Sequence, residues 1–214
     1  MVTFEYCSLH YLNLWLSGDR LFLENLSSKD INKQLKALKN IAKSYSIARN
    51  LPLAGDIEKV GVKLERYEPV LEIINQIKIP IEESECVQLV VNTKEAIRGL
   101  YGVQALSLTT KFLWFKIKSP ILIYDSQARK ALRVAAGDYQ EFCTIWKAGY
   151  AKKSKQIESA CSKLPNMRRY TSDPDIATEE KIKEISQERW FMERVFDTYP
   201  VSYTHLRAHE TVLD

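Results

Sequence analysis

One carboxylate stands between an apolar run and a set of cations. Residues 119–132 read SPILIYDSQARKAL, and Asp125 is the single acid among six Lys and Arg residues from Lys111 to Arg133. A carboxylate just before a helix accepts backbone N–H bonds and meets the positive end of the helix dipole. A carboxylate fixed at the edge of a core can instead stabilise positive charge that develops on a substrate. The residues themselves leave both interpretations open, a helix cap and a catalytic acid.

Basic side chains follow Asp125 and return further along the chain. The segment from Lys152 to Arg169 holds six Lys and Arg residues against the single acid Glu158, in a chain of net charge +4. Such unevenness favours a face that binds a polyanion, although solvated lysines alone would give the same pattern. The cations that would contact phosphates beside Asp125 are Arg129, Lys130 and Arg133, and those that would extend the track are Lys152, Lys153, Lys155, Arg168 and Arg169.

Other classes of chemistry find little support in the sequence. The four cysteines lie far apart with no CxxC pair, which disfavours a zinc or iron–sulfur site and predicts thiols in a reducing cytoplasm. No phosphate-cradling glycine loop and no nucleophile-elbow serine is present. His10 has aromatic and leucine neighbours, which are typical of a packed or surface histidine. We therefore expect no metal and no cofactor.

The chain has no marks of secretion or of membrane insertion. No stretch approaches the roughly 20 apolar residues of a membrane span. The first residues, MVTFEYCSLHYLNLWLSGDR, lack the basic region and the continuous apolar region of a signal peptide. These features predict a cytoplasmic protein without a membrane partner.

The last fourteen residues, VSYTHLRAHETVLD, differ from what precedes them. They show no clear amphipathic period and follow Pro200, which we expect to end the preceding helix. They resemble a translated sequencing adapter, so we interpret 201–214 as a non-native tail and expect the natural C-terminus to be missing. His205 and His209 are then neither ligands nor bases, despite a four-residue spacing that suits a metal site.

Short connections, seven glycines and no sustained two-residue alternation predict an all-α protein. We expect one compact multi-helix domain over residues 1–200. Asp30 is the predicted N-cap of a helix reaching about Arg49, with Ile31, Leu35 and Leu38 in its apolar stripe. The other predicted helices cover 5–16, 68–77, 84–98, 105–117, 126–135, one or two segments of 138–164, and a single final helix from 177 to 199.

A family resemblance rests on the order of three segments. A turn with glycines (RGLYGVQ) precedes an apolar helix with a lysine (LSLTTKFLWF), and then a short apolar run enters an Asp that caps a basic helix (PILIYDSQARKAL). This arrangement resembles the core of the helix-hairpin-helix DNA glycosylase superfamily, over about residues 95 to 135. In that family the hairpin amides grip a DNA phosphate, and the Asp faces the flipped nucleotide and assists loss of its base.

The resemblance implies a role for each matching residue. Asp125 would be the catalytic carboxylate, and Lys111 would form a Schiff base if the enzyme also cleaves the strand. Gly102 and Gln104 would contribute the phosphate-binding turn, while Trp114 and Tyr124 would offer a surface for the extruded base. The implied substrate is double-stranded DNA with a flipped base, damaged or modified, and the implied reaction needs no cofactor.

The sequence also departs from the family pattern. The hairpin of the family has a second glycine where this chain has Gln104, and its usual lysine position falls near Leu106 or Ser107, one turn before Lys111. Two alternatives to a glycosylase therefore stay open. One is a non-catalytic helical domain that binds nucleic acid, and the other is a helical protein-interaction domain in which Asp125 is a cap alone. The sequence does not specify the base, a repair or defence role, or the oligomeric state.

Overall fold

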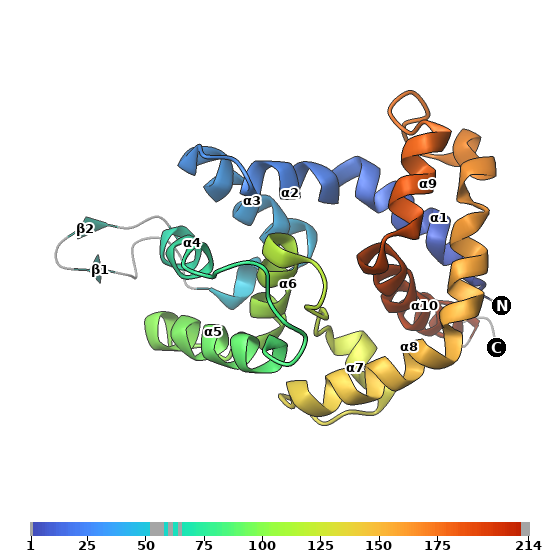
Figure 1. The fold of residues 1–214 in the computed structure, drawn as a ribbon. Coiled ribbons are helices and arrows are strands. Elements are labelled where there is room, and N and C mark those ends of the chain that lie inside the picture. Colours follow the sequence, from blue (N-terminus) through green and yellow to red (C-terminus); the bar gives the residue numbers. More distant parts are fainter. Residues whose placement is uncertain (1, 52–57, 60–61, 64–65, 211–214) are drawn as a thin grey trace. The chain divides into compact units, whose positions relative to one another are not determined.

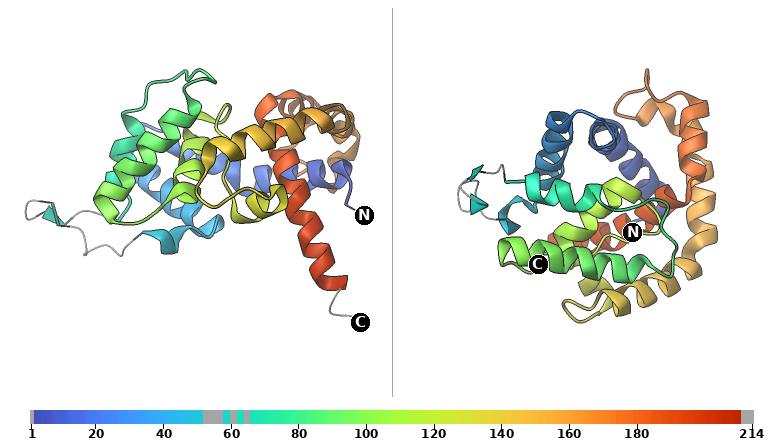
Figure 2. Two further views of the ribbon diagram at one scale, coloured as in Figure 1. Left: turned by 90° about the horizontal axis from the view of Figure 1, so that it is seen from below. Right: turned by 60° about the vertical axis from the view of Figure 1, so that its left-hand side comes forward.

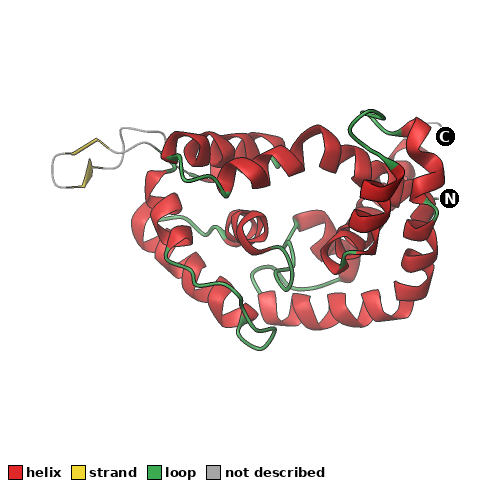
Figure 3. Ribbon diagram, turned by 45° about the horizontal axis from the view of Figure 1, so that its top comes forward, coloured by secondary structure: helices red, strands yellow, loops and turns green. Residues whose placement is uncertain are grey.

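The computed structural model describes residues 2–51, 58–59, 62–63 and 66–210, and these residues are organised as an all-α protein. Ten α-helices lie in the described part of the chain, and the two short strands β1 (Glu58–Lys59) and β2 (Val62–Lys63) form a small antiparallel pair (Figure 3). The predicted all-α class is confirmed.

The helices divide between two compact units (Figure 1). The terminal unit is made of Met1–Arg20 and Asp125–Asp214, so that both ends of the chain contribute to it, and the central unit is Leu21–Tyr124. Our prediction of one domain over 1–200 stays a prediction. The boundary at Tyr124 falls within the segment that suggested the family resemblance.

The terminal unit begins with α1 (Phe4–Leu14), which continues into the π-helical turn Trp15–Asp19; all of the next helix, α2 (Arg20–Leu26), except Arg20 belongs to the central unit. The other elements of the terminal unit are α7 (Ser126–Leu132), α8 (Tyr139–Ser162), the 3-10 segment Leu164–Tyr170, α9 (Glu179–Gln187) and α10 (Arg189–Glu210). Helix α1 packs against α8 and α10, and α7 packs against the same two helices.

Aromatic side chains fill the core of the terminal unit. The Trp15 and Trp190 rings lie 4.6 Å apart between centroids, and Tyr11 meets Phe191 at 5.2 Å. All four of these side chains are buried. Since these contacts join α1 to α10, burial of large apolar rings holds the two sequence-distant parts of this unit together.

The central unit holds α3 (Ile31–Ser44), α4 (Glu68–Asn75), α5 (Cys86–Tyr101) and α6 (Leu106–Ile117). Helix α6 packs against α3, α4 and α5. Eight consecutive residues of α6, Leu108–Phe115, are buried, so this helix is enclosed on all sides. The Phe115 ring meets Phe22 at 6.0 Å and Tyr45 at 5.5 Å.

Five helices begin at a side chain that caps them. Thr3, Asp30, Asp125, Asp138 and Thr178 each accept a hydrogen bond from a backbone N–H two or three residues ahead. These bonds satisfy donors that the first turn of a helix leaves unpaired. The predicted cap at Asp30 is confirmed, with an Asn32 N to Asp30 Oδ1 distance of 2.9 Å.

Several predicted boundaries are corrected. The helix from Asp30 ends at Ser44 instead of Arg49, and Ile31, placed in its apolar stripe, is 53% exposed. The helix before the glycine turn reaches Tyr101, three residues further than predicted. Helix α7 ends at Leu132 because Arg133 adopts the left-handed conformation, with φ of 58°.

The last predicted helix is two helices. An extended residue, Glu188 (ψ 134°), separates α9 from α10. Helix α10 then runs to Glu210 (Figure 2). The prediction that Pro200 ends this helix is therefore wrong. The non-native origin of 201–214 remains a prediction that this backbone does not test.

Candidate functional site

Asp125 lies at the start of α7, and its carboxylate caps that helix. Its Oδ1 accepts a hydrogen bond from Gln127 N at 2.8 Å, and its carbonyl accepts from Arg129 N at 2.9 Å. The residue is half-buried, with φ of −115° and ψ of 145°. Asp125 is therefore a helix cap by geometry, and its carboxylate is held in one orientation at the margin of the terminal unit.

The apolar run before Asp125 belongs to the central unit and forms no strand. Ile121, Leu122, Ile123 and Tyr124 are all buried. The Tyr124 amide donates to Thr110 Oγ1 at 3.0 Å, which attaches the run to α6. The Tyr124 ring is 7% exposed and offers little surface for stacking a base.

The cations of α7 divide into one bonded residue and two exposed ones. Arg129 Nη1 donates to the Val134 carbonyl at 2.7 Å, so this guanidinium closes the C-terminal end of its own helix. Lys130 and Arg133 are exposed. These two side chains are the members of the predicted phosphate-binding set that lie on the surface beside Asp125.

Only part of the basic track from Lys152 to Arg169 has side chains exposed to contact a phosphate. Lys152 and Lys155 are exposed on α8, whereas Lys153 is half-buried. Arg168 donates from Nε to the Pro174 and Ala177 carbonyls, both at 3.0 Å, and so anchors the segment before α9. The Arg169 guanidinium lies over the exposed Tyr170 ring, 4.7 Å from its centroid.

Lys111 and Trp114 lie inside the central unit. Lys111 is 4% exposed, its Nζ donates to Ser107 Oγ at 3.1 Å, and the same ammonium lies 5.9 Å from the Tyr45 ring centroid. Trp114 is 1% exposed and packs edge-on against Phe115 at 5.0 Å. The burial of Trp114 favours core packing over base stacking for this ring.

The glycine turn connects α5 to α6 in four residues. Gly102 adopts the left-handed conformation, with φ of 67°, and its amide donates to the Arg98 carbonyl at 2.8 Å. This is the C-terminal cap that glycine favours, because a side chain is disfavoured at positive φ. Gln104 is exposed in the same turn. The predicted turn with glycines between two helices is therefore present, and we call α5, this turn and α6 the helix–turn–helix. At the start of α6, the side chain of Ala105 makes no capping hydrogen bond.

Sequence reasoning missed a buried charged network behind α7. Asp197 on α10 accepts from Trp146 Nε1 at 2.7 Å and from Arg194 Nη1 at 2.8 Å, one donor for each carboxylate oxygen. Burial raises the pKa of Asp197; the Arg194 charge and both hydrogen bonds oppose this rise, while the Asp125 charge adds to it. No local pattern joins Trp146 to Asp197, which are 51 residues apart, whereas Arg194 and Asp197 are three residues apart on α10.

A second ion pair lies one turn earlier on α10. Glu193 is buried, and its Oε1 receives a bond from Arg189 Nε at 2.8 Å. Burial, with a further contribution from the Glu193 charge, raises the pKa of Tyr150 to about 12. The two acids are four residues apart on one helix, which is the one sequence signal that could have suggested a shared buried face.

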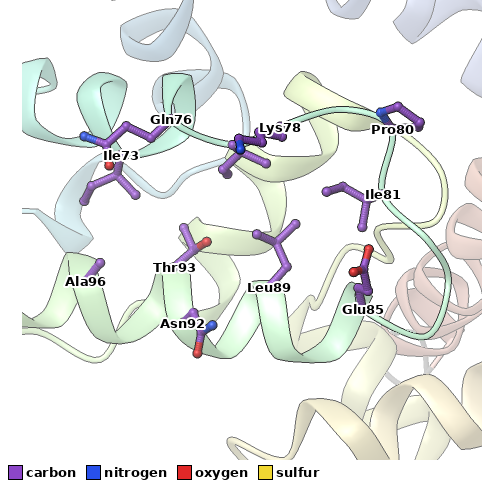
Figure 4. A pocket seen from close by; sticks show the side chains of 11 residues that line it. Ile73, Gln76, Lys78, Pro80, Ile81, Glu85, Leu89, Asn92, Thr93 and Ala96 are labelled. Carbon is purple, nitrogen blue, oxygen red and sulfur yellow. The ribbon is translucent and has the colours of Figure 1, made fainter.

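The central unit carries a groove of about 520 Å³ between α4, α5 and the segment that joins them (Figure 4). Its lining is mostly apolar with a few amides and charges. None of the predicted site residues lines it. The lining residues are Ile73, Gln76, Ile77, Lys78, Pro80, Ile81, Glu85, Leu89, Asn92, Thr93 and Ala96.

The described residues offer neither a metal cluster nor a helix that could span a membrane. They contain no group of three or more His, Cys, Asp or Glu side chains arranged to hold a metal ion. In the same part of the chain, every helix is too short or too polar to cross a bilayer. All four cysteines are buried thiols, and burial raises the pKa of Cys161 to about 12.

The structure thus divides the predicted site residues between the units. Asp125, Arg129, Lys130 and Arg133 belong to the terminal unit. The remaining predicted residues, Gly102, Gln104, Lys111, Trp114 and Tyr124, belong to the central unit. Comparison of the chain with protein-family models, with curated proteins and with solved structures finds no match.

Proposed function

We propose that the protein is a DNA glycosylase that hydrolyses the N-glycosidic bond of a damaged or modified base, with Asp125 as its catalytic carboxylate. The observation that carries this proposal is the placement of Asp125. A fixed, half-buried carboxylate stands at the start of a helix that bears the exposed cations Lys130 and Arg133. The helix–turn–helix of α5 and α6, with its left-handed Gly102, supports the same reading.

The chemistry requires little beyond a positioned carboxylate. As the C1′–N bond breaks, its electron pair leaves with the base and the sugar gains oxocarbenium character. A water oxygen then bonds to C1′, its proton passes to the carboxylate, and the departing base takes up a proton. A fixed negative charge in a poorly hydrated site stabilises that sugar cation much better than water does.

The exposed cations give the phosphate contacts that such a substrate needs. Lys130 and Arg133 are within one turn of each other beside Asp125, and each could neutralise one phosphate. Affinity for a duplex should therefore fall as salt rises. Lys130→Glu should weaken binding, and Lys33→Glu, which changes an exposed cation on α3, is the matched control. A duplex affinity that changes neither with salt nor in Lys130→Glu would contradict nucleic acid as the partner.

The decisive experiment compares two helix caps. Asp125→Asn keeps an acceptor for the Gln127 amide and should cost only the charge–dipole term, about 0.3–1 kcal/mol of unfolding free energy. Base release from a lesion that the parent processes should fall by about 100-fold or more, as for the loss of a major charge-stabilising group. Asp138→Asn is the matched control, since Asp138 caps α8 through a 2.8 Å bond from Glu141 N. Equal base release by the Asp125 variant and the parent would reduce Asp125 to a cap.

A second candidate is a nucleic-acid-binding domain without chemistry. The observation that favours it is the burial of Lys111, whose ammonium donates to Ser107 Oγ inside the central unit. Borohydride trapping on an abasic duplex tests Lys111 directly. Trapping that disappears in Lys111→Ala would make Lys111 the Schiff-base residue, and base release without trapping would mean a monofunctional enzyme. Salt-dependent binding without release of any base would select the second candidate.

A further inference from the structure

The network around Asp197 is a buried charged cluster behind the candidate acid. Both carboxylate oxygens of Asp197 have a donor, and the side chains of Asp197 and Arg194 are each only 11% exposed. Arg194 also lies over the Tyr11 ring of α1, 5.1 Å from its centroid. The Trp146 ring stacks on Tyr150 at 5.3 Å, which fixes the indole N–H donor.

This cluster lies against the helix that Asp125 caps. Helix α7 packs on α10, which carries Arg194 and Asp197, and on α8, which carries Trp146. Asp125 is close enough for its negative charge to act on the Asp197 carboxyl group. Of the two carboxylates, Asp197 forms the ion pair with the Arg194 guanidinium, at 2.8 Å.

We propose that Asp197 is a positioning residue for Asp125: by neutralising the buried Arg194 guanidinium, it leaves the Asp125 carboxylate on the first turn of α7. Without Asp197, the Arg194 charge would be buried and uncompensated. The nearby Asp125 carboxylate would then be drawn toward Arg194 and away from the cap. The catalytic consequence rests on the glycosylase activity proposed above, whereas the charge coupling does not.

The coupling can be measured without any activity. The Asp197 carboxyl group is followed by carbon-13 NMR as pH is changed, in the parent, in Asp125→Asn and in the control Asp138→Asn. The groups whose charges act on Asp197 are Arg194 of its own helix and Asp125 of α7. Removing the Asp125 charge should lower the pKa of Asp197, and Asp138→Asn should leave it unchanged. An Asp197 pKa that is the same in the parent and in Asp125→Asn would overturn the inference.

The positioning role is tested with a charge-balanced variant. Asp197→Asn should slow base release by about 10- to 100-fold, the range typical of groups that orient a functional residue from behind. Asp197→Asn/Arg194→Met removes both charges together, a change that buried ion pairs often tolerate, and it should recover most of the lost rate. A double variant as slow as the single variant would assign Asp197 a structural role alone and overturn the proposal.

The NMR titration and the base-release assay distinguish failure of the glycosylase proposal from failure of the positioning role of Asp197. If the parent releases no base from any lesion, the glycosylase proposal fails, and the NMR titration still decides whether Asp125 and Asp197 are coupled. If the parent is active but Asp197→Asn keeps the parental rate, the glycosylase proposal stands and the positioning role is wrong. Thermal unfolding of both variants by circular dichroism identifies any loss of rate that comes from loss of fold.

Discussion

The two units of the chain bury different kinds of polar group. The terminal unit buries the carboxylates of two ion pairs of α10, Arg189–Glu193 and Arg194–Asp197, which are 4% and 11% exposed, although the Arg189 side chain is 57% exposed. Among the described residues of the central unit, the buried charged side chain is that of Lys111 on α6, whose ammonium lies 5.9 Å from the Tyr45 ring centroid. A buried charge is costly unless it is paired. The comparison therefore separates a unit with buried carboxylates paired to arginines from one whose buried cation meets a hydroxyl and an aromatic ring.

The apolar cores of the two units are, in contrast, alike. Phe112 in the central unit and Phe191 in the terminal unit are both 0% exposed. Each contacts another aromatic ring, Phe112 with Tyr67 at 6.4 Å and Phe191 with Tyr11 at 5.2 Å between centroids. What distinguishes the units is electrostatics and not the quality of packing. Four predictions test this distinction.

The largest effect is expected from truncating a core ring in either unit. Phe112→Ala and Phe191→Ala should each lower the free energy of unfolding by about 3–5 kcal/mol, because each removes a fully buried ring and leaves a cavity. Denaturant titration measures both. Tyr6→Ala, at a side chain that is 56% exposed, is the control and should have a small effect. A loss below about 1 kcal/mol for one phenylalanine would show that its unit does not depend on this core.

The next effect compares a buried ion pair with an exposed one. Asp197→Asn leaves the Arg194 charge buried without its partner and should cost about 3–5 kcal/mol. The side chains of Lys163 and Glu5 form an ion pair and are 54% and 42% exposed. Lys163→Met breaks this pair and should lower the free energy of unfolding by about 0–1 kcal/mol. Equal costs in the same denaturant titration would contradict the claim that burial makes the Asp197 pair special.

A smaller effect tests the turn of the central unit. A Cβ at Gly102 would meet nothing within 4 Å, so Gly102→Ala should cost about 1–2 kcal/mol through the left-handed backbone alone. Gly99→Ala is the matched control, because Gly99 lies inside α5 with equally open space and should stabilise the helix by about 0.5–1 kcal/mol. Opposite signs in thermal unfolding confirm the turn, and a stabilising Gly102→Ala would contradict it.

The smallest effect is a difference in pH dependence within the terminal unit. Burial raises the pKa of Asp197 above 3.8, so its contribution favours folding at low pH and is lost as pH rises through the folded-state pKa. A hydrogen bond from Lys163 lowers the pKa of Glu5 below 4.5, so the Glu5 contribution is present above that pH and lost as pH falls through the folded-state pKa.

Unfolding free energies of the parent, Asp197→Asn and Glu5→Gln across the acidic range measure these two contributions. As pH rises, the free energy of unfolding of the parent should fall relative to that of Asp197→Asn. The difference between the parent and Glu5→Gln should shift in favour of the parent. Two curves of the same slope would remove the distinction between buried and exposed carboxylates.

The helical class and the helix starts could be predicted from the sequence because their causes are local. Asp30 and Asp125 cap the helices that follow them, since a side chain two residues away supplies the bond. The left-handed Gly102 ends α5 for an equally local reason. Helix ends were less predictable. Arg133 ends α7 with a positive φ, although arginine is not a residue type that favours this conformation.

The roles of the aromatic and basic candidates depended on tertiary packing. Trp114 and Lys111 lie on a helix that is enclosed on every side, so no periodicity could separate its core face from its solvent face. Arg129 is drawn to the Val134 carbonyl of its own helix end. Exposure of each side chain was decided by its neighbours and not by its type.

The sequence by itself determined an all-α protein and placed Asp125 at a helix start beside cations. Only the tertiary structure placed Asp197, Arg194 and Trp146 behind that cap. The physical reason is that a cap and the Arg194–Asp197 pair are each made within one turn of chain, whereas the Trp146 hydrogen bond to Asp197 needs a second helix. Packing of α8 on α10 brings the Trp146 donor to Asp197 across 51 residues.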